Sequence, residues 1–271
     1  MPSRPVRFLT ATALSVVLGL SVAGCNTING PETTGSIGAA SAPPAPRTEA
    51  EWRASLDVWG KRYRENPGDP SAAIAYARAL RATEQYAQAA AVLEQAAMRN
   101  PHDMPLLGAY GRALADNGQY AQALDALGRA HTPDNPDWRI LNAEGAVLDQ
   151  MGRHADARRH YAAALKIMPN DPSVLSNLGL SYALTKELKK AEQTLRLAVA
   201  QPNAESKVRQ NLALVVGLEG RFAEAEQIAA ADLPPAEAQA NVQYLHAMLD
   251  QQNGWKKRGH SITIPRARAG T

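Results

Sequence analysis

The sequence contains a single cysteine and only two phenylalanines among its 271 residues. One cysteine cannot close a disulfide within the chain, and alone it cannot build a thiolate metal site. Runs of aromatic and β-branched residues, which favour strands, are few, whereas alanine, the strongest helix former, is abundant. With 45% apolar and 20% charged residues, the composition is that of a globular chain. We therefore expect an all-α fold.

Motifs for catalysis and metal binding are also missing. The glycines occur singly, so there is no glycine-rich phosphate loop, and no HExxH motif occurs. His154 and His160 are six residues apart, which places them on different faces of a helix and argues against a metal pair. We expect His154 to be a packing residue. Glu144 and Asp149 are five residues apart and are not expected to act as paired carboxylates. The sequence therefore predicts a protein that is not an enzyme and needs no cofactor or metal.

The stretch 1–24 has the layout of a secretory signal peptide. Arg4 and Arg7 make a basic start, and an uncharged, largely apolar stretch runs from residue 8 to residue 24. This stretch is short for a membrane-spanning helix, which needs ~20 apolar residues. It ends in the sequence LSVAGC, so that the only cysteine, Cys25, closes it. An ordinary signal followed by an incidental cysteine is the alternative interpretation.

The LSVAGC sequence resembles the bacterial lipobox. The resemblance implies cleavage before Cys25, a diacylglycerol on its sulfur and acylation of the new amino group. Two or more acyl chains hold a protein firmly on a membrane, so the anchor would be permanent. Asn26, where lipoproteins of the inner membrane usually carry Asp, implies by the same resemblance the periplasmic face of the outer membrane. Residues 26–47 are rich in Gly, Pro, Ser, Thr and Ala, which predicts a flexible tether of roughly 25 Å.

The rest of the chain repeats itself with a period of about 34 residues, from about residue 70 to about residue 239. A small residue recurs at one position of the repeat and an alanine at another. The two rows are Ala77, Gly111, Gly145, Gly179 and Ala213, and Ala89, Ala123, Ala157, Ala191 and Ala225. Glycine inside a helix costs ~1 kcal/mol relative to alanine. We therefore interpret the glycines as points where two helices of one repeat pack closely.

The spacing resembles that of the tetratricopeptide repeat. Gly145-x-x-Leu148, Ala157-x3-Tyr161 and Pro169 fall on its signature positions. The resemblance implies a solenoid of five helix-turn-helix repeats over residues 70–239. Helical patterns over 48–69 and 235–251 predict capping helices at the two ends. Residues 252–271 are predicted to be a basic, disordered tail.

In tetratricopeptide proteins the first helix of each pair lines the surface that binds a peptide or helix. The outward positions of these helices change from basic to apolar along the chain, which suits an amphipathic helix or an extended segment with an acidic end. Packing of the leucines against neighbouring repeats is an equally acceptable reading. The positions are Arg78, Arg81, Arg112, Asn142, Ala146, Asp149, Asn177, Leu180, Leu184, Gln210, Asn211, Leu214 and Leu218.

The charge distribution gives no support for a nucleic-acid partner. The formal net charge of +3 falls to +1 without Arg4 and Arg7. Residues 255–271 contain five basic residues and no acid, so residues 25–254 carry about −4. A mildly acidic body does not attract nucleic acid. The basic tail is expected to be solvated, and contact with an anionic membrane, a cell-wall polymer or a partner remains open.

The stretch KVRQNLALVVGLEG at 207–220, with RFAEAEQIAAADL and QANVQYLHAML after it, resembles the TadD proteins of the tight-adherence (Flp) pilus system. The resemblance is strongest in the last third of the chain. It implies an outer-membrane lipoprotein that acts as a pilotin, helping the pilus secretin to assemble. The alternative is a general envelope scaffold, acting in outer-membrane protein assembly or in recruiting peptidoglycan enzymes. A hydrolase or transferase would need a convergent polar pocket, for which the sequence shows no residues.

Overall fold

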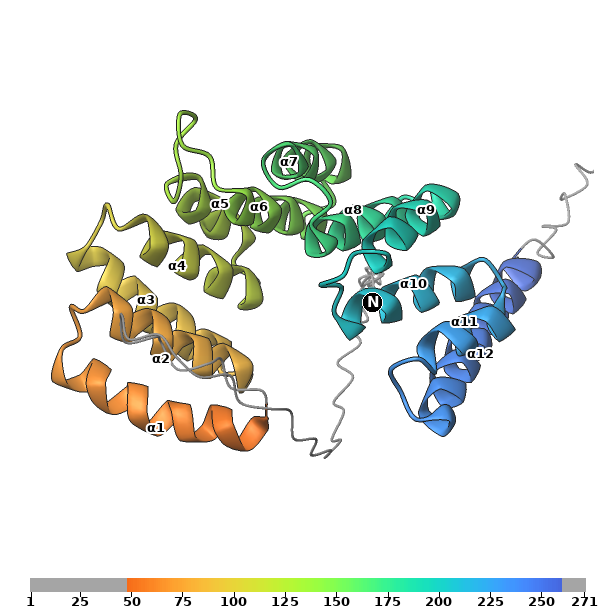
Figure 1. Ribbon diagram of the computed structural model, residues 1–271, viewed down its shortest axis with the longest axis horizontal. Coiled ribbons are helices and arrows are strands. Elements are labelled where there is room, and N and C mark those ends of the chain that lie inside the picture. The colour runs from red at the N-terminus through yellow and green to blue at the C-terminus, as the bar shows by residue number, and fades with distance from the viewer. Residues whose placement is uncertain (1–47, 260–271) are drawn as a thin grey trace, which may run out of the picture. The chain divides into compact units, whose positions relative to one another are not determined.

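The computed structural model describes residues 48–259, with side chains described as far as residue 251 (Figure 1). Within this part of the chain there are twelve helices and no strand, only an isolated bridge between Thr132 and Asn135. The predicted all-α class is confirmed. The predicted signal peptide, Cys25, the tether and the last twelve residues of the predicted tail lie outside the described residues.

The helices form five antiparallel pairs between two flanking helices (Figure 1). The first flanking helix is α1 (Glu49–Glu65). The pairs are α2 (Pro70–Ala82) with α3 (Tyr86–Arg99), α4 (Met104–Asp116) with α5 (Tyr120–Gly128), α6 (Trp138–Gln150) with α7 (His154–Ile167), α8 (Pro172–Leu184) with α9 (Leu188–Val199), and α10 (Ser206–Leu218) with α11 (Phe222–Ala229). The last helix is α12 (Pro235–Gly259). The predicted tetratricopeptide-repeat solenoid is therefore confirmed. Helix α12 continues to Gly259, so the first eight residues of the predicted tail are helical.

The first helix of most pairs begins at an aspartate in a fixed position of the repeat. Asp69, Asp103, Asp137 and Asp171 occupy the N-cap positions of α2, α4, α6 and α8, and each side chain accepts a hydrogen bond from a backbone N–H of the first turn. Such caps satisfy donors that have no partner within the helix. Glu205 holds the same position before α10 and makes no such bond. The caps were not predicted, although their spacing, which equals the period of the repeat, is visible in the sequence.

The turn between the two helices of each pair uses a left-handed residue. Gly118, Gly152 and Gly220 have φ angles of 76°, 74° and 83°. The equivalent positions in the first and fourth pairs hold Glu84 and Lys186, with φ angles of 60° and 63°. Glycine adopts this conformation without cost, whereas other residues are strained by their Cβ atom. The backbone of the turn is thus the same in all five pairs, whichever residue stands there.

Close packing within a pair depends on glycine. A Cβ atom at Gly145 would lie 2.5 Å from the ring of Tyr161 on the facing helix, and one at Gly111 or Gly179 would lie 2.6 or 2.7 Å from Leu127 or Leu195. These distances leave no space for a methyl group. The prediction that the glycine row marks close helix contacts is confirmed.

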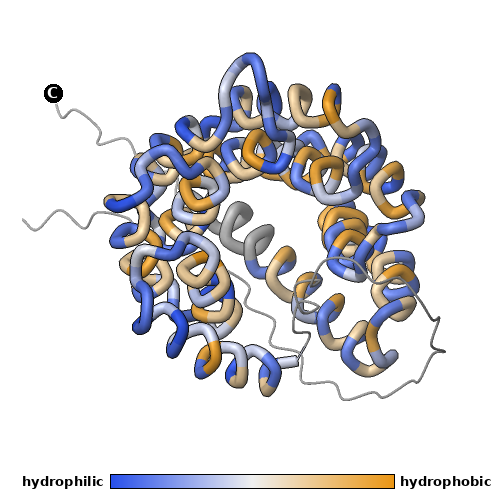
Figure 2. The backbone as a smooth tube through the Cα atoms, turned by 60° about the vertical axis from the view of Figure 1, so that its left-hand side comes forward, coloured by the Kyte–Doolittle hydropathy of each residue, from blue (hydrophilic) through white to orange (hydrophobic). Residues whose placement is uncertain are grey.

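The stacking of the pairs places the first helices on one side. Helices α2, α4, α6, α8 and α10 each contact the next in this series, and α10 contacts α12. The Cα atoms of the second helices α3, α5, α7, α9 and α11 come within 8 Å of neighbouring first helices and, for α11, of α12. In the described part of the chain no two second helices approach each other so closely, although side chains do meet, as in the ion pair of Arg196 on α9 with Glu224 on α11. The closer approach of the first helices means that the stack curves with these helices inside, and Figure 2 shows the curved path of the backbone. We call this side the first-helix face. None of the described helices is long and apolar enough to cross a membrane.

Candidate protein-binding face

One position of the first-helix face changes its chemistry from repeat to repeat. Taken at the same position of each successive repeat, the row consists of Arg78, Arg112, Ala146, Leu180 and Leu214. Arg78 and Leu214 are exposed, and the three between them are half-buried. Because the backbone repeats, these side chains lie along one line across α2, α4, α6, α8 and α10. The predicted change from basic to apolar is thus presented on one continuous surface.

The apolar end of this row is open to solvent. Leu184 on α8 and Leu214 on α10 are 57% and 42% exposed. Leu180 and Leu218, beside them on the same helices, are half-buried. Two of the four leucines therefore pack partly against neighbours and two are exposed, and their role in binding a partner stays a prediction. We call these four residues the leucine strip.

Several predicted partner-binding residues hold neighbouring first helices together. Asn177 Nδ2 donates to Asn142 Oδ1 at 3.0 Å, and Asn211 Nδ2 donates to Ser176 Oγ at 2.9 Å. Arg81 forms an ion pair with Asp116 in the same way between α2 and α4. In all three pairs the two bonded residues are 35 positions apart in the sequence, which is one more than the period of the repeat. Gln210 donates to Ser206 on its own helix at 3.2 Å.

This spacing has a simple geometric origin. Residues that are one repeat apart lie side by side on adjacent first helices. The residue that comes one position later on the second of these helices has its side chain directed toward the first. Arg81, Asn142, Asn177 and Asn211 therefore line the seams between repeats. Their polar groups already form hydrogen bonds or ion pairs with the neighbouring helix. They therefore stabilise the first-helix face and are less available for contacts with a partner.

The prediction that Asp149 faces outward to a partner is wrong. Its side chain is only 8% exposed and accepts hydrogen bonds from Tyr161 Oη at 3.0 Å and Ser181 Oγ at 2.8 Å. His154 Nδ1 lies 2.8 Å from the same carboxylate. These partners come from α7 and α8, so Asp149 joins three helices. Burial, and then the nearby carboxylate, raise the pKa of the Tyr161 hydroxyl above its usual value, so it remains a donor.

A second buried carboxylate lies on the same helix. The Glu144 side chain is 8% exposed and lies between two imidazoles, with His160 Nδ1 at 3.1 Å and His131 Nε2 at 3.5 Å. Glu144 and Asp149 are thus both buried, and each bonds to its own set of partners. Across the described part of the chain, no three His, Cys, Asp or Glu side chains are placed to hold a metal ion.

The basic end of the row contains a guanidinium that is largely removed from water. Burial, and then the charges of Arg81, Arg78 and Arg139, lower the pKa of Arg112, while Asp137 opposes this effect. Among residues 48–251 no carboxylate forms an ion pair or hydrogen bond with Arg112. Arg78, Arg81 and Arg139 thus lie near enough to Arg112 for their charges to act on it, and of these the sequence did not single out Arg139. The basic patch as a binding surface stays a prediction.

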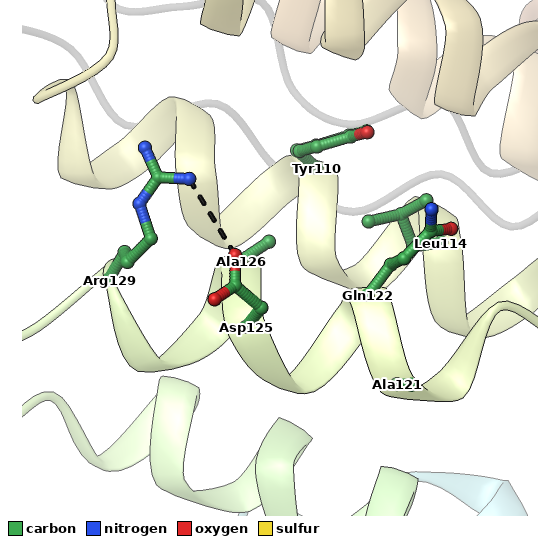
Figure 3. A pocket seen from close by; sticks show the side chains of 7 residues that line it. All are labelled: Tyr110, Leu114, Ala121, Gln122, Asp125, Ala126 and Arg129. Atoms are coloured by element: carbon green, nitrogen blue, oxygen red, sulfur yellow. Dashed lines mark ion pairs between the residues drawn. The ribbon is translucent and has the colours of Figure 1, made fainter.

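A shallow cavity of about 440 Å³ lies elsewhere, between α4 and α5 (Figure 3). Tyr110 and Leu114 of α4 line it together with five residues of α5 and its C-terminal end. Its charged groups, Asp125 and Arg129, form an ion pair with each other at 3.7 Å. They leave no free acid or base directed at a common point, so the cavity offers no catalytic arrangement.

Comparison with known proteins agrees with this geometry. The profile described as "Tetratricopeptide repeat" matches residues 150–215, and that described as "Anaphase-promoting complex, cyclosome, subunit 3" matches residues 58–130. Residues 150–215 thus match the tetratricopeptide repeat by profile, and the fold of the described residues is that of a tetratricopeptide-repeat solenoid. Tetratricopeptide repeats are protein-interaction scaffolds and are generally not enzymes. No curated protein matches the sequence.

Several solved structures share this fold. PilW, titled a widely conserved type IV pilus biogenesis factor, has a TM-score of 0.60 at 16% identity over 72% of this chain and 91% of its own. Cut9–Hcn1 of the anaphase-promoting complex gives 0.57 at 16% identity, over 73% of this chain and only 40% of that one. Human IFIT1 with PPP-AAAA gives 0.58 at 17% identity, over 78% of this chain and 52% of that one. At these identities the likeness extends to the fold alone.

Proposed function

We propose that this tetratricopeptide-repeat protein is a lipid-anchored scaffold on the periplasmic face of the outer membrane. In this role it holds a segment of the Flp/Tad pilus secretin on its first-helix face and so acts as a pilotin. It needs no cofactor beyond the lipid on Cys25. The proposal has three parts, namely the binding surface, the location and the partner.

The observation that carries the binding surface is the leucine strip. Leu184 and Leu214 belong to neighbouring first helices and expose 57% and 42% of their surface on the same face. An apolar side chain of this size gains roughly 1.5–3 kcal/mol on full burial. Two such side chains in adjacent repeats suit the apolar face of a helix or of an extended segment.

The location and the partner rest on sequence resemblance. The lipobox ending in Cys25, followed by Asn26, supports anchoring at the outer membrane. The similarity of residues 207–220 to TadD supports the pilus system, and this stretch includes α10 with its part of the leucine strip. PilW, a pilus biogenesis factor by its title, shares the fold and is covered over 91% of its length.

A binding experiment tests the surface. The carboxy-terminal segment of the secretin is used to capture the full chain, either unchanged or as the double variant Leu184→Glu/Leu214→Glu. The matched control is Leu197→Glu on α9, because Leu197 is 59% exposed but belongs to a second helix. We expect capture to be lost only in the double variant. Equal capture of all three proteins would refute the assignment of the leucine strip.

A cellular experiment tests the anchor. Cys25→Ser should displace both this protein and the secretin ring from the outer membrane, since the lipid provides the location. A secretin ring that assembles normally without the lipoprotein would contradict the pilotin role. Loss of many envelope proteins with intact pili would instead support a general envelope scaffold.

A further inference from the structure

At the end away from the leucine strip, the row of the first-helix face consists of arginines that form no ion pair with any carboxylate among residues 48–251. Arg78 on α2 and Arg112 on α4 hold equivalent positions of successive repeats. Arg139, in the first turn of α6, lies close enough for its charge to lower the pKa of Arg112. Three successive first helices therefore contribute one cation each to the same area, which we call the arginine site.

The carboxylates near this site already have other roles. Asp116 forms its ion pair with Arg81. Asp137 caps α6, where its Oδ1 accepts a hydrogen bond of 2.7 Å from the backbone N–H of Arg139. It therefore acts on Arg112 from a distance, without an ion pair. The carboxylates of the described residues do not neutralise the guanidinium of Arg112.

The guanidinium of Arg112 lies beside Gly108 of its own helix. A Cβ atom at Gly108, one turn earlier on α4, would lie 3.6 Å from Nη2 of Arg112 and 2.6 Å from Ile140. The absence of a side chain at Gly108 thus gives the guanidinium a place against its own helix. The neighbouring guanidinium of Arg139 lies over the ring of Trp138, with its carbon 4.4 Å from the ring centroid.

A cation removed from water without a partner is unfavourable, and an incoming carboxylate would remove much of that cost. Arginine binds carboxylate through two parallel hydrogen bonds, which are stronger than bonds between neutral groups. A ligand with carboxylates therefore fits the chemistry of the site. The acidic balance of residues 25–254 disfavours a nucleic-acid polyanion and favours a local acidic segment of a protein.

The spacing of the arginines sets the length of that segment. Packed helices lie about 8–10 Å apart, so the site extends about 16–20 Å from α2 to α6. An extended chain advances about 3.3 Å per residue, and about six residues cover this distance. A single terminal carboxylate would reach only part of the site.

We propose that the arginine site binds a run of about six residues rich in Asp and Glu within a partner protein, with carboxylates on Arg78, Arg112 and Arg139. This inference rests on the proposed function and deepens it, because it gives the chemistry of the part of the bound segment that lies beyond the leucine strip. The leucine strip holds apolar side chains, and the arginine site holds the acidic run.

A peptide titration tests the inference. The full chain in detergent is titrated against a fluorescein-labelled, carboxy-amidated hexapeptide of alternating Asp and Glu, and against its Asn/Gln counterpart. We expect anisotropy to show binding of the acidic peptide alone, weakened by added salt. Arg112→Gln should weaken binding at least tenfold and Arg78→Gln several-fold. The control Arg159→Gln, which removes an exposed arginine of α7, should leave binding unchanged.

Arg78 is exposed, so its variant keeps the test valid even if Arg112→Gln does not fold. Binding that neither variant changes would overturn the inference. So would an RNA hexamer that binds as tightly and with the same dependence on Arg112, because the site would then be a general anion site.

The two proposals fail separately. Loss of secretin capture in Leu184→Glu/Leu214→Glu, without any binding of the acidic peptide, would retain the proposed function and reject the arginine site. Binding of the acidic peptide, together with unchanged secretin capture by Leu184→Glu/Leu214→Glu, would retain the arginine site and reject the proposed function.

Discussion

The hydroxyl of Tyr161 on α7 donates a hydrogen bond of 3.0 Å to the carboxylate of Asp149 on α6. The Tyr161 side chain is 1% exposed, and its ring fills the space left by Gly145. The middle pair of helices is therefore joined by an apolar and a polar contact made by one residue. Ser181 of α8 bonds to the same carboxylate at 2.8 Å and links this pair to the next.

Replacing this tyrosine by phenylalanine separates the two contacts. Tyr161→Phe keeps the ring and removes one donor from a buried carboxylate. Hydrogen bonds to charged groups contribute about 1.5–3 kcal/mol, so we expect the free energy of unfolding to fall by that amount. Urea denaturation followed by circular dichroism measures it. Tyr244→Phe on α12 is the control, because Tyr244 is 55% exposed, and an equal loss there would contradict the role of Asp149.

Two glycines in helices should respond in opposite ways to alanine. A Cβ atom at Gly145 meets the Tyr161 ring at 2.5 Å, whereas one at Gly128 meets only Glu144 Oε1, at 3.9 Å. We expect Gly145→Ala to lower the free energy of unfolding by about 1–3 kcal/mol through overpacking. Gly128→Ala should raise it by up to ~1 kcal/mol, because alanine is the better helix former. Thermal melting of both variants checks the signs, and a gain at Gly145 would show that the pair can open at little cost.

The turn position offers a stabilising change. Lys186 has a φ of 63° where Gly152 and Gly220 occur in other repeats. The left-handed conformation costs an ordinary residue about 1–2 kcal/mol, and the flexibility of glycine in the unfolded chain offsets part of that. Lys186→Gly should therefore raise the free energy of unfolding by roughly 0.5–1 kcal/mol. Gly152→Ala should lower it similarly, although no atom lies within 4 Å of the added methyl group. Opposite shifts in chemical denaturation are the expected result.

The loss of stability at acidic pH should depend on Glu192. Burial raises the pKa of this carboxyl, but hydrogen bonds and charges of Arg196 and Arg221 outweigh it and lower the pKa to about 2. Arg221 Nη1 lies 2.7 Å from Glu192 Oε1. A carboxyl with a lowered pKa in the folded state stabilises the protein above its unfolded pKa of about 4.5, and loses that effect as pH falls toward 2.

The variant Glu192→Gln tests this linkage. We expect it to be less stable than the unchanged protein at pH 7, with the difference shrinking between about pH 4.5 and pH 2. Thermal melting across this range measures the difference. Glu94→Gln on α3, an exposed carboxylate, should show no such trend. A constant difference for Glu192→Gln at all pH values would mean that its charge is not the stabilising feature.

Much of the fold could be predicted because its causes are local. Small residues at Gly111, Gly145 and Gly179 mark helix contacts within a repeat, and the period of the repeat places them whatever the rest of the chain does. The aspartate caps and the left-handed turn positions follow the same period, so the sequence contained them although they were not recognised. Helix α12 runs eight residues beyond its predicted end, because the basic residues that predict a disordered tail, such as Lys256 and Lys257, belong to the helix.

The sequence by itself thus determined the repeat, its register and the change from Arg78 to Leu214 along one row, because these depend only on spacing. The tertiary structure decided which polar residues are free. Asp149 looked like an outward residue, yet Tyr161 and Ser181 enclose it, and Asn142 and Asn177 bond to each other across a seam. The bonds of Asp149 with Ser181 and of Asn142 with Asn177 join one pair of helices to the next, so their geometry depends on how the pairs pack. The same packing half-buries Arg112, and no carboxylate among residues 48–251 forms an ion pair with it.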